Sequence, residues 1–164
     1  MYRDAWLIDP WAFARTSGHR DGAMGVADMP RLSGMVLQSG GVLDVRVTGT
    51  FGQDKGAYLH VKVSGLVWLT CQRCLDPVEH VVGHDVLFQL WPVDAALPDE
   101  ELFEDAFDAL PVAEQLDLAQ VVEDEVLLGL PLAPRHQACR LPRSAVGPVE
   151  MSAFEVLRKM KRPH

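Results

Sequence analysis

The sequence predicts an α+β fold: an antiparallel β-rich sheet or partly open barrel with one main packed helix, over about residues 118–130, and short terminal helices. Two observations lead to this prediction. Apolar and polar residues alternate in several stretches between residues 43 and 90, which is typical of half-buried strands. A single later stretch repeats its apolar residues at helical spacing. The 164 residues, 48% of them hydrophobic, suffice for one core.

The N-terminal region should hold one short helix. Asp9-Pro10 has the form of an N-cap followed by proline at the first helical position, and the helix should run through Arg15. From Thr16 to Arg31 the chain is rich in Gly, Asp and other polar residues without clear periodicity. This composition predicts a loop or a loosely ordered arm.

Three or more antiparallel strands are expected to form the sheet. The first lies around residues 43–48, a turn follows at residues 52–56, and a second strand begins at Ala57. Gly65 interrupts the second strand, so we expect a bent strand or a hairpin arm ending at Cys71. Asp76-Pro77 separates it from a third strand over residues 78–90. The apolar faces comprise Leu43, Val45 and Val47, then Leu59, Val61 and Val63, and finally Val82, Val86, Phe88 and Leu90.

An acidic insertion, about residues 92–115, separates the strands from the main helix. Its apolar anchors are Leu102, Phe103, Phe107 and Leu110. Asp117 then caps the helix, which Pro131 and Pro134 end. The apolar stripe of the helix comprises Leu118, Val121, Val122, Val126 and Leu128. Glu123 and Asp124 should point away from this stripe, whereas Glu125 falls inside it. We therefore expect Glu125 to be a structural buried carboxylate, paired, hydrogen-bonded or tilted to the rim.

The C-terminal region is predicted to be a tail helix, residues 149–164, attached to a single globular domain, residues 1–148. Ser152-Ala-Phe-Glu155 has the spacing of a capping box, and the short helix that follows is marginal in isolation. It is a candidate for a segment that becomes ordered on a partner or on RNA. Its candidate binding residues, together with Arg73, are Phe154, Leu157, Arg158, Lys159, Lys161 and Arg162.

Charge is distributed unevenly along the chain. Residues 1–73 carry 8 basic and 6 acidic side chains, residues 74–134 carry 15 acidic side chains and no Lys or Arg, and residues 135–164 carry 7 basic and 2 acidic side chains. Because phosphate binding depends on Lys and Arg, the middle segment cannot serve alone as a nucleic-acid surface, and any RNA contact should use the ends. The acidic segment is either a solvated face or a docking face for a basic partner.

Nothing in the sequence indicates a membrane protein or a secreted one. No apolar run approaches the length that spans a bilayer, and the N-terminus lacks the pattern of a secretory signal. The three cysteines are an odd number and do not form the framework of a disulfide-rich domain. We expect a cytoplasmic protein with reduced or metal-bound thiols.

All three cysteines belong to one possible ligand set. Cys71 and Cys74 lie in a turn after a strand, and His136 and Cys139 lie in a Pro-bounded loop after the helix. Two short-spaced pairs of this kind suit the tetrahedral geometry of structural zinc if the fold brings them together. Alternatively, the cysteines are small buried residues and His136 is an exposed loop side chain.

Enzymatic alternatives use the same residues. A thiol oxidoreductase would need a nucleophilic thiolate, usually at a helix N-terminus, but the residues after Cys74 suggest a turn into a strand. A zinc-dependent hydrolase would need an open coordination position and a general base such as Glu125. Because four protein ligands leave no room for water, we expect no enzymatic activity and no small-molecule substrate. The chain contains no P-loop, GxGxxG or GxSxG motif.

Four segments together resemble the YceD family, the large ribosomal RNA subunit accumulation proteins. They are Cys71-Gln-Arg-Cys74-Leu, residues 122–131, the loop from Pro134 through His136 to Cys139, and Phe154-Glu-Val-Leu-Arg-Lys-Met-Lys. The resemblance implies a bacterial, cytoplasmic, non-enzymatic accessory role in accumulation, processing or assembly involving 23S ribosomal RNA or its precursor. A basic ribosomal protein is a further expected partner. An adaptor that binds protein without RNA contact is the remaining alternative.

Overall fold

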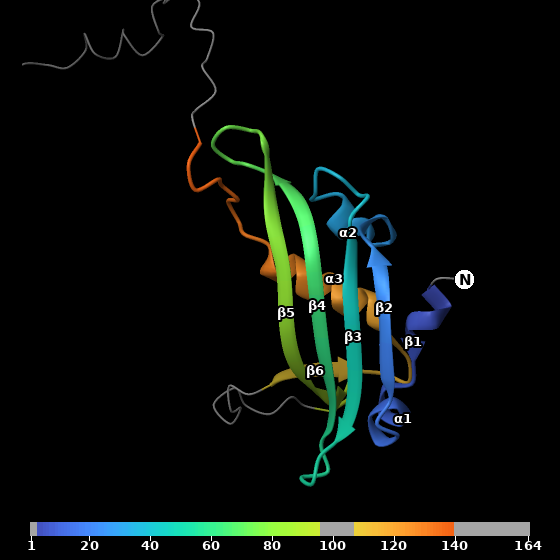
Figure 1. Ribbon diagram of the computed structural model, residues 1–164. Coiled ribbons are helices and arrows are strands. Elements are labelled where there is room, and N and C mark those ends of the chain that lie inside the picture. Colours follow the sequence, from blue (N-terminus) through green and yellow to red (C-terminus); the bar gives the residue numbers. More distant parts are fainter. Residues whose placement is uncertain (1–2, 96–106, 140–164) are drawn as a thin grey trace, which may run out of the picture.

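The structure is a computed structural model that describes residues 3–95 and 107–139. Its elements are η1 (Arg3–Trp6), β1 (Leu7–Ile8), α1 (Pro10–Arg15), β2 (His19–Gly25), η2 (Val26–Asp28), α2 (Pro30–Ser33), β3 (Val42–Phe51), β4 (Ala57–Thr70), β5 (Pro77–Pro92), β6 (Asp108–Val112), β7 (Leu116–Asp117) and α3 (Leu118–Gly129). The α+β prediction is confirmed, and the sheet is open rather than closed into a barrel (Figure 1). No helix among the described residues has the length and apolarity needed to cross a membrane.

The main sheet has five strands in the order β2-β3-β4-β5-β6. Strands β2 to β5 form an antiparallel meander, and β6 lies parallel to β5, pairing residues 108–112 with residues 88–92. Strands β1 and β7 form a separate antiparallel pair. The long β4–β5 hairpin extends the sheet at one end, and its tip lies beside the segment that follows α3 (Figure 1).

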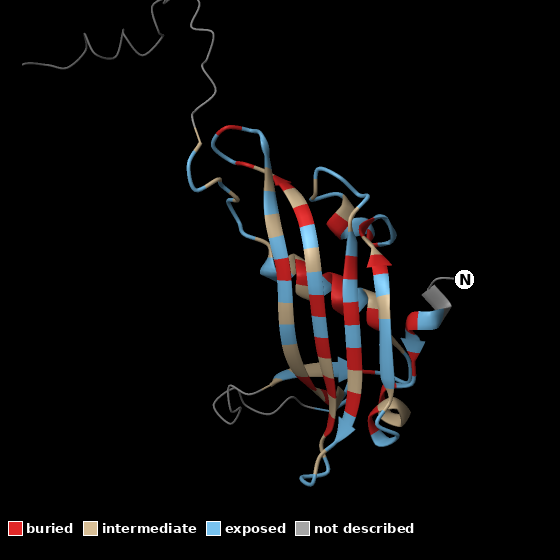
Figure 2. Cartoon of the chain, in the orientation of Figure 1, coloured by how far each residue is buried: buried red, intermediate tan, exposed pale blue. Residues whose placement is uncertain are grey.

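The core lies between one face of the sheet and α3. The alternation predicted from the sequence is confirmed: the predicted apolar faces of β3 and β4 are buried, as are Val82, Phe88 and Leu90 of β5 (Figure 2). Gly65 does not break β4, whose register continues without interruption to Thr70. A Cβ at Gly65 would lie 2.6 Å from a methyl group of Leu43, so glycine is needed there for close packing between strands.

The first helix begins where the sequence predicts. The Asp9 carboxylate accepts a hydrogen bond from the Ala12 N–H at 2.9 Å, and Pro10 occupies the first turn. The helix then packs on β3, where a Cβ at Gly49 would lie 2.6 Å from the Phe13 carbonyl oxygen. The short helix therefore depends on a glycine in the neighbouring strand.

The prediction of a loop from residue 16 to residue 31 is wrong. This segment forms β2, η2 and α2. Strand β2 buries only Met24, so it lacks the alternation by which the other strands were recognised. Gly22 lies within β2, opposite Val45, and not in a turn. The Trp6 ring covers this part of the strand, and a Cβ at Gly22 would lie 2.9 Å from it. Pairing with the edge of β3 forms the strand in spite of its polar composition.

Helix α3 is confirmed, but the burial of two of its side chains differs from the prediction. Leu128 is 81% exposed rather than part of the packed stripe, because it lies at the edge of the stripe in the last turn. Glu123, predicted to point to solvent, is buried. Its side chain meets α2, an element that the sequence did not predict, and this contact decides its placement.

The predicted acidic insertion is described only in part. Phe107 packs edge-on against Tyr58, with ring centroids 5.8 Å apart, and Leu110 packs against the core. Strand β6, which the sequence did not predict, lies within the range assigned to the insertion. Leu102, Phe103 and the predicted tail helix lie outside the described residues.

Candidate metal centre

The tip of the β4–β5 hairpin holds the first cysteine pair. The Cys71 N–H donates to the Asp76 carbonyl at 3.0 Å, and the Leu75 N–H donates to the Cys71 carbonyl at 3.0 Å. Leu75 has a φ of 66°, the left-handed conformation that turns the chain back sharply. This tight turn places both thiols on the same side, and both are buried.

The second pair comes from the segment that follows α3. Two hydrogen bonds hold this segment against the hairpin: the Gln72 N–H donates to the Pro134 carbonyl at 2.8 Å, and the His136 Nε2–H donates to the Pro77 carbonyl at 2.9 Å. The prolines at 131 and 134 prevent the helix from continuing and direct the chain toward the hairpin tip. His136 and Cys139 are both half-buried there.

The two pairs meet, as the zinc prediction requires. The ligand atoms of Cys71, Cys74, His136 and Cys139 all lie within 4.8 Å of one another. Cys71 Sγ lies 3.9 Å from Cys139 Sγ, and Cys74 Sγ lies 3.4 Å from His136 Nδ1. Tetrahedral zinc with ordinary bond lengths would give edges of about 3.8 Å between two sulfurs and about 3.6 Å between sulfur and nitrogen. The four residues could therefore hold a metal ion with little rearrangement.

The hydrogen bond to Pro77 selects the tautomer of His136. With the proton on Nε2, Nδ1 keeps its lone pair and faces the thiols. Histidine ligands of metals commonly donate their second ring N–H to a backbone carbonyl in this way, which fixes the ring and increases its basicity. The described residues thus provide both a ligand set and a supporting contact behind it.

The two hairpin thiols differ in acidity. Burial raises the pKa of Cys71, but the backbone N–H groups of Cys74, Arg73 and His136 outweigh burial and lower it to about 5. The N–H of Asp76 lowers the pKa of Cys74, but burial and the neighbouring thiols Cys71 and Cys139 outweigh it and raise the pKa to about 11. The Cys71 thiolate also raises the pKa of His136 through a hydrogen bond.

These acidities fit a metal centre. Of the two hairpin thiols the cluster favours ionised Cys71 and protonated Cys74, because a second negative charge beside the first in a buried space is costly. A divalent cation would supply the positive charge that lets the remaining thiols ionise, and metal binding would release protons.

A redox centre fits less well. A low thiol pKa also suits a thiol oxidoreductase, but β5 rather than a helix follows Cys74. Both hairpin thiols are buried. The ligand cluster contains no carboxylate, so it includes no general base of the kind that a zinc hydrolase uses.

Helix α3 carries a buried carboxylate at Glu123 rather than at Glu125. Glu123 Oε1 accepts from the backbone N–H groups of Arg31 at 2.7 Å and Leu32 at 3.0 Å, and Oε2 accepts from the Arg31 side chain at 3.1 Å. It thereby caps α2, whose own N-cap residue makes no side-chain hydrogen bond. Glu125 is half-buried, and burial followed by the negative charges of Asp108 and Asp124 raises its pKa. No ion pair of Glu125 occurs among the described residues.

Of the candidate RNA- or partner-binding residues, only Arg73 is described. It is exposed at the hairpin tip, between the two cysteines. The others, Phe154, Leu157, Arg158, Lys159, Lys161 and Arg162, lie outside the described residues. Their role stays a prediction.

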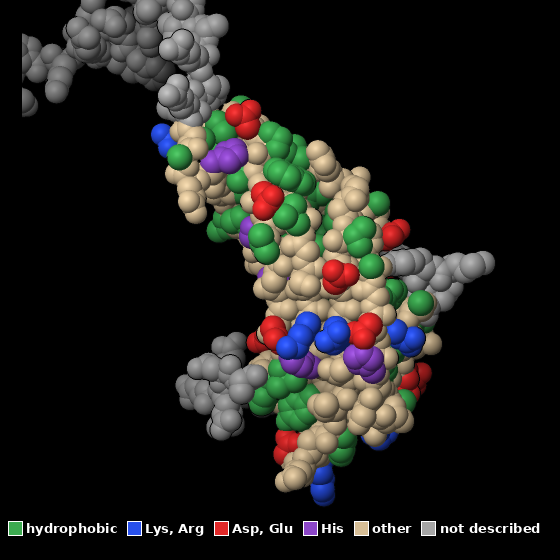
Figure 3. Space-filling model, viewed as in Figure 1, with side chains coloured by type: hydrophobic (Ala, Val, Ile, Leu, Met, Phe, Trp, Pro, Cys, Tyr) green, Lys and Arg blue, Asp and Glu red, His purple; other side chains and the backbone are tan. Residues whose placement is uncertain are grey.

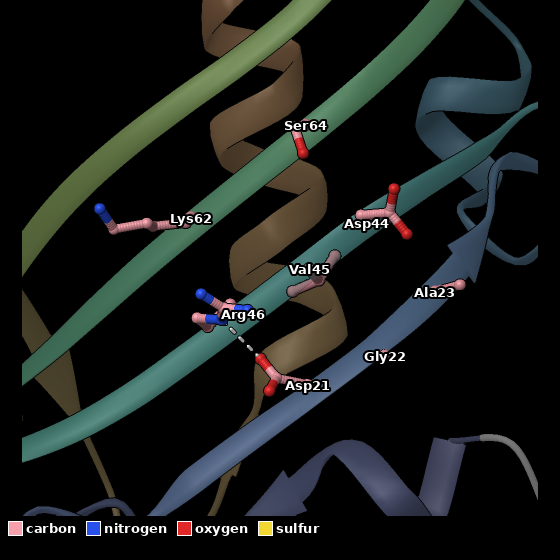
Figure 4. Close-up of a pocket in the computed structure, with 8 residues that line it drawn as sticks. All are labelled: Asp21, Gly22, Ala23, Asp44, Val45, Arg46, Lys62 and Ser64. Carbon is pink, nitrogen blue, oxygen red and sulfur yellow. Dashed lines mark hydrogen bonds and ion pairs between the residues drawn. The ribbon is translucent and has the colours of Figure 1, made fainter.

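A charged row on the outer face of the sheet was not predicted from the sequence. Asp21, Arg46, Lys62 and Asp85 lie in register across β2 to β5, and two ion pairs join them: Arg46 Nε to Asp21 at 2.9 Å and Lys62 Nζ to Asp85 at 2.7 Å (Figure 3). The row borders a shallow depression that also includes Asp44 and Ser64 (Figure 4). Since its cations already bond to carboxylates, the row is a weak candidate for phosphate binding. Only the strand register, which single-sequence patterns do not give, could have revealed it.

Comparison with known proteins supports the resemblance found in the sequence. The family described as large ribosomal RNA subunit accumulation protein YceD matches residues 59–162. This range contains β5, α3, all four residues of the cysteine–histidine cluster and most of the basic C-terminal segment. No solved structure matches the chain. Because the match covers more than half of the sequence, the chain belongs to the YceD family.

Proposed function

We propose that the protein is a non-enzymatic, cytoplasmic accessory factor for large-subunit ribosomal RNA, acting in its accumulation, processing or assembly. The family match over residues 59–162 is the observation that carries this proposal. The distribution of charge adds to it, because the 7 basic side chains of residues 135–164 suit RNA and the 15 acidic side chains of residues 74–134 suit a basic ribosomal protein.

We further propose that the cysteine–histidine cluster binds structural zinc. Three thiols and one imidazole are the ligands that zinc prefers, and the separations of 3.9 Å and 3.4 Å are close to the edges of its tetrahedron. In this role Cys71, Cys74, His136 and Cys139 fasten the segment after α3 to the hairpin tip. The ion would provide positive charge and cross-linking, and four protein ligands would leave no position for a reacting water.

The cellular test is a deletion strain analysed on sucrose gradients during growth in the cold. Loss of the protein should deplete large subunits and leave abnormal large-subunit RNA, and the wild-type gene should restore both. A strain that lacks the protein and yet shows normal profiles and normal RNA in the cold would rule the function out.

A second experiment separates RNA contact from protein contact. Ultraviolet crosslinking in growing cells should attach large-subunit RNA to the full chain, and replacing Arg158, Lys159, Lys161 and Arg162 with alanine should reduce this crosslinking at least tenfold. Replacing Lys55 and Lys62 instead controls for loss of positive charge in general. Crosslinking that survives the first replacement would place the RNA contact elsewhere and remove the tail from the proposal.

The thiol chemistry distinguishes this proposal from a redox enzyme, which the low pKa of Cys71 would otherwise favour. One zinc per purified chain, with no disulfide formed during growth, is expected for a structural site. Reversible formation of a Cys71–Cys74 disulfide with turnover of a thiol substrate would instead indicate an oxidoreductase.

A further inference from the structure

The hydrogen-bond ladder between β4 and β5 shows which backbone groups of β5 are left for another partner. The Cys71 N–H donates to the Asp76 carbonyl, and the register continues with Thr70 opposite Pro77. Because bonded and non-bonded pairs alternate in an antiparallel ladder, the even-numbered residues from 78 to 88 bond to β4. The odd-numbered residues from 79 to 87 direct their N–H and C=O groups to the opposite side. Pro77 is also odd-numbered, and its carbonyl faces away from β4 and accepts a hydrogen bond from His136.

The opposite side of β5 is covered at its two ends. Strand β6 pairs with residues 88–92, and His136 occupies the Pro77 carbonyl. Between these points, no backbone pairing with the edge occurs among the described residues, and the segment that follows α3 runs beside the upper half of β5 on this side (Figure 1). Val81 is 69% exposed, and a Cβ at Gly83 would meet no atom within 4 Å. Among the described residues, the open edge of residues 79–87 therefore has no backbone partner on this side up to the Leu87 N–H, a length that suits an added strand.

This open edge has few of the features by which proteins block exposed strands. It contains no proline and no bulge, and its central residue is a glycine without steric cover. Glu79, Val81, Gly83 and Asp85 direct both backbone groups to this side, and Leu87 offers only its N–H, because pairing of Phe88 with Asp108 uses its carbonyl. An edge of this kind suits binding of an extended peptide, in which backbone hydrogen bonds give affinity.

The surroundings of the open edge are acidic. Glu79 and Asp85 project from the strand itself, Asp108 begins β6 at the lower end, and no Lys or Arg occurs between residues 74 and 134. Lys62 and His60, one strand away, already bond to Asp85, so Glu79 and Asp108 are the carboxylates at this edge without an ion pair among the described residues. On α3, the raised pKa of Glu125 reflects burial and the nearby carboxylates Asp108 and Asp124. A cationic segment would relieve this concentration of negative charge.

We propose that the edge of β5 at residues 79–87 binds an extended, Lys- and Arg-rich segment of a protein partner as an added strand. The backbone of that segment bonds to the outward-facing residues, and its cations lie beside Glu79 and Asp108. The identity of the partner as a component of the assembling large subunit rests on the proposed function. The strand register and the charges around β5 support the edge independently of that function.

Gly83 offers a matched pair of variants. Its N–H faces outward, so Gly83→Pro removes one donor and places a ring in the path of the added strand without removing a bond to β4. Gly83→Ala keeps the N–H and puts a methyl group into open space. Gly83→Ala should unfold within about 2 °C of the wild type. Gly83→Pro, which fixes φ within the strand, should unfold at a lower temperature and stay folded under the conditions of the assay.

The test is amide hydrogen exchange of the full chain, followed by NMR. In the free protein the amides of Val81, Gly83 and Asp85 should exchange at least tenfold faster than those of Val82 and His84, which bond to β4. A nine-residue peptide of alternating Val and Lys should slow the fast set at least tenfold, whereas alternating Val and Glu should not. Gly83→Ala should respond like the wild type, and Gly83→Pro should not respond.

Several results would overturn the proposal. Slow exchange of the outward amides in the free chain would mean that another part of the chain or a second copy already covers the edge. Equal protection of the outward amides by the Lys and Glu peptides would show that charge plays no role. Equal protection of Gly83→Ala and Gly83→Pro by the Lys peptide would show that the peptide does not bind along the edge. A Lys peptide that is N-methylated at alternate residues cannot donate hydrogen bonds to β5, so it tests strand addition without any variant of the protein. If this peptide protects the outward amides as well as the unmethylated one, strand addition is refuted.

Failure of this proposal can be told apart from failure of the proposed function. If deletion of the gene leaves large-subunit profiles normal, the function is wrong. If deletion depletes large subunits and Gly83→Pro restores them as fully as Gly83→Ala, the function stands and only the edge proposal fails.

Discussion

Replacing Glu123 with alanine should lower the free energy of unfolding by about 2–5 kcal/mol, because the carboxylate holds three hydrogen bonds between α3 and α2. Glu123 is 4% exposed, and the N–H groups of Arg31 and Leu32 that it caps begin α2. Alanine would leave both N–H groups without an acceptor. Each unpaired buried donor costs about 1–3 kcal/mol, and partial access of water to Arg31 keeps the sum below the upper limit.

Two milder variants calibrate this expectation. Glu123→Gln keeps one carbonyl oxygen for the two backbone donors and loses the bond to the Arg31 side chain, so we expect a loss of about 1–2 kcal/mol. Asp124→Asn removes the ion pair of 2.6 Å to Arg31, but both side chains are more than half exposed, so the loss should stay below about 1 kcal/mol.

Urea unfolding followed by tryptophan fluorescence provides the measurement, with an unchanged dependence on urea showing that the variants unfold in the same manner. The expected order of destabilisation is Glu123→Ala, then Glu123→Gln, then Asp124→Asn. The capping argument is refuted if Glu123→Ala lies within about 1 kcal/mol of the wild type, or if Asp124→Asn is equally damaging.

Three further predictions concern the metal, a half-buried acid and a glycine. If zinc is bound, free zinc at a thousand times its Kd adds about 4 kcal/mol to the free energy of unfolding, so chelation should lower the midpoint of thermal unfolding by about 8–16 °C. The midpoint of Cys71→Ser should not change with chelator. An unchanged midpoint of the wild type would contradict the site. Glu125→Gln should raise the midpoint at neutral pH, because burial and Asp108 raise the pKa of this carboxyl and the folded chain disfavours its ionised form. That gain should vanish below the ordinary pKa of 4.5, and a gain independent of pH would count against it. Gly49→Ala should cost about 1–3 kcal/mol in urea unfolding, because its Cβ would meet the Phe13 carbonyl at 2.6 Å; a neutral effect would show that α1 can shift freely.

The sequence predicted the parts of the fold that follow a simple periodicity. Apolar and polar residues alternate clearly in β3, β4 and β5. The predicted N-caps of α1 and α3, Asp9 and Asp117, are confirmed. Strand β2 was missed because it buries Met24 alone and owes its form to pairing with β3. Strand β6 was missed for a related reason, since its parallel pairing with β5 is a long-range contact.

The candidate site was predicted as a set of residues, and its geometry was not. The spacing of Cys71 with Cys74 and of His136 with Cys139 named the four ligands, but only the fold shows that they meet. The placement of Glu123 was predicted wrongly because a helical wheel registers only the stripe facing the sheet. It does not register α2, whose unpaired N–H groups turn an apparently solvent-facing carboxylate into a buried cap.

The cysteine–histidine cluster also marks where the basic part of the chain begins. Cys139 lies 3.9 Å from Cys71, so the chain beyond it starts from the hairpin tip, beside the exposed Arg73. Helix α3 and the hydrogen bonds of Pro134 and His136 to the hairpin already bring the chain to this point, and the cluster lies at its end. The same hairpin carries the acidic open edge of β5, which begins two residues after Pro77. If zinc binds as proposed, the cross-link would fix Cys139, where the basic segment starts, beside the hairpin that carries the acidic edge of β5. The proposed metal ion would then need no catalytic role to matter, because it would set where the proposed RNA-binding segment begins relative to the proposed peptide-binding edge.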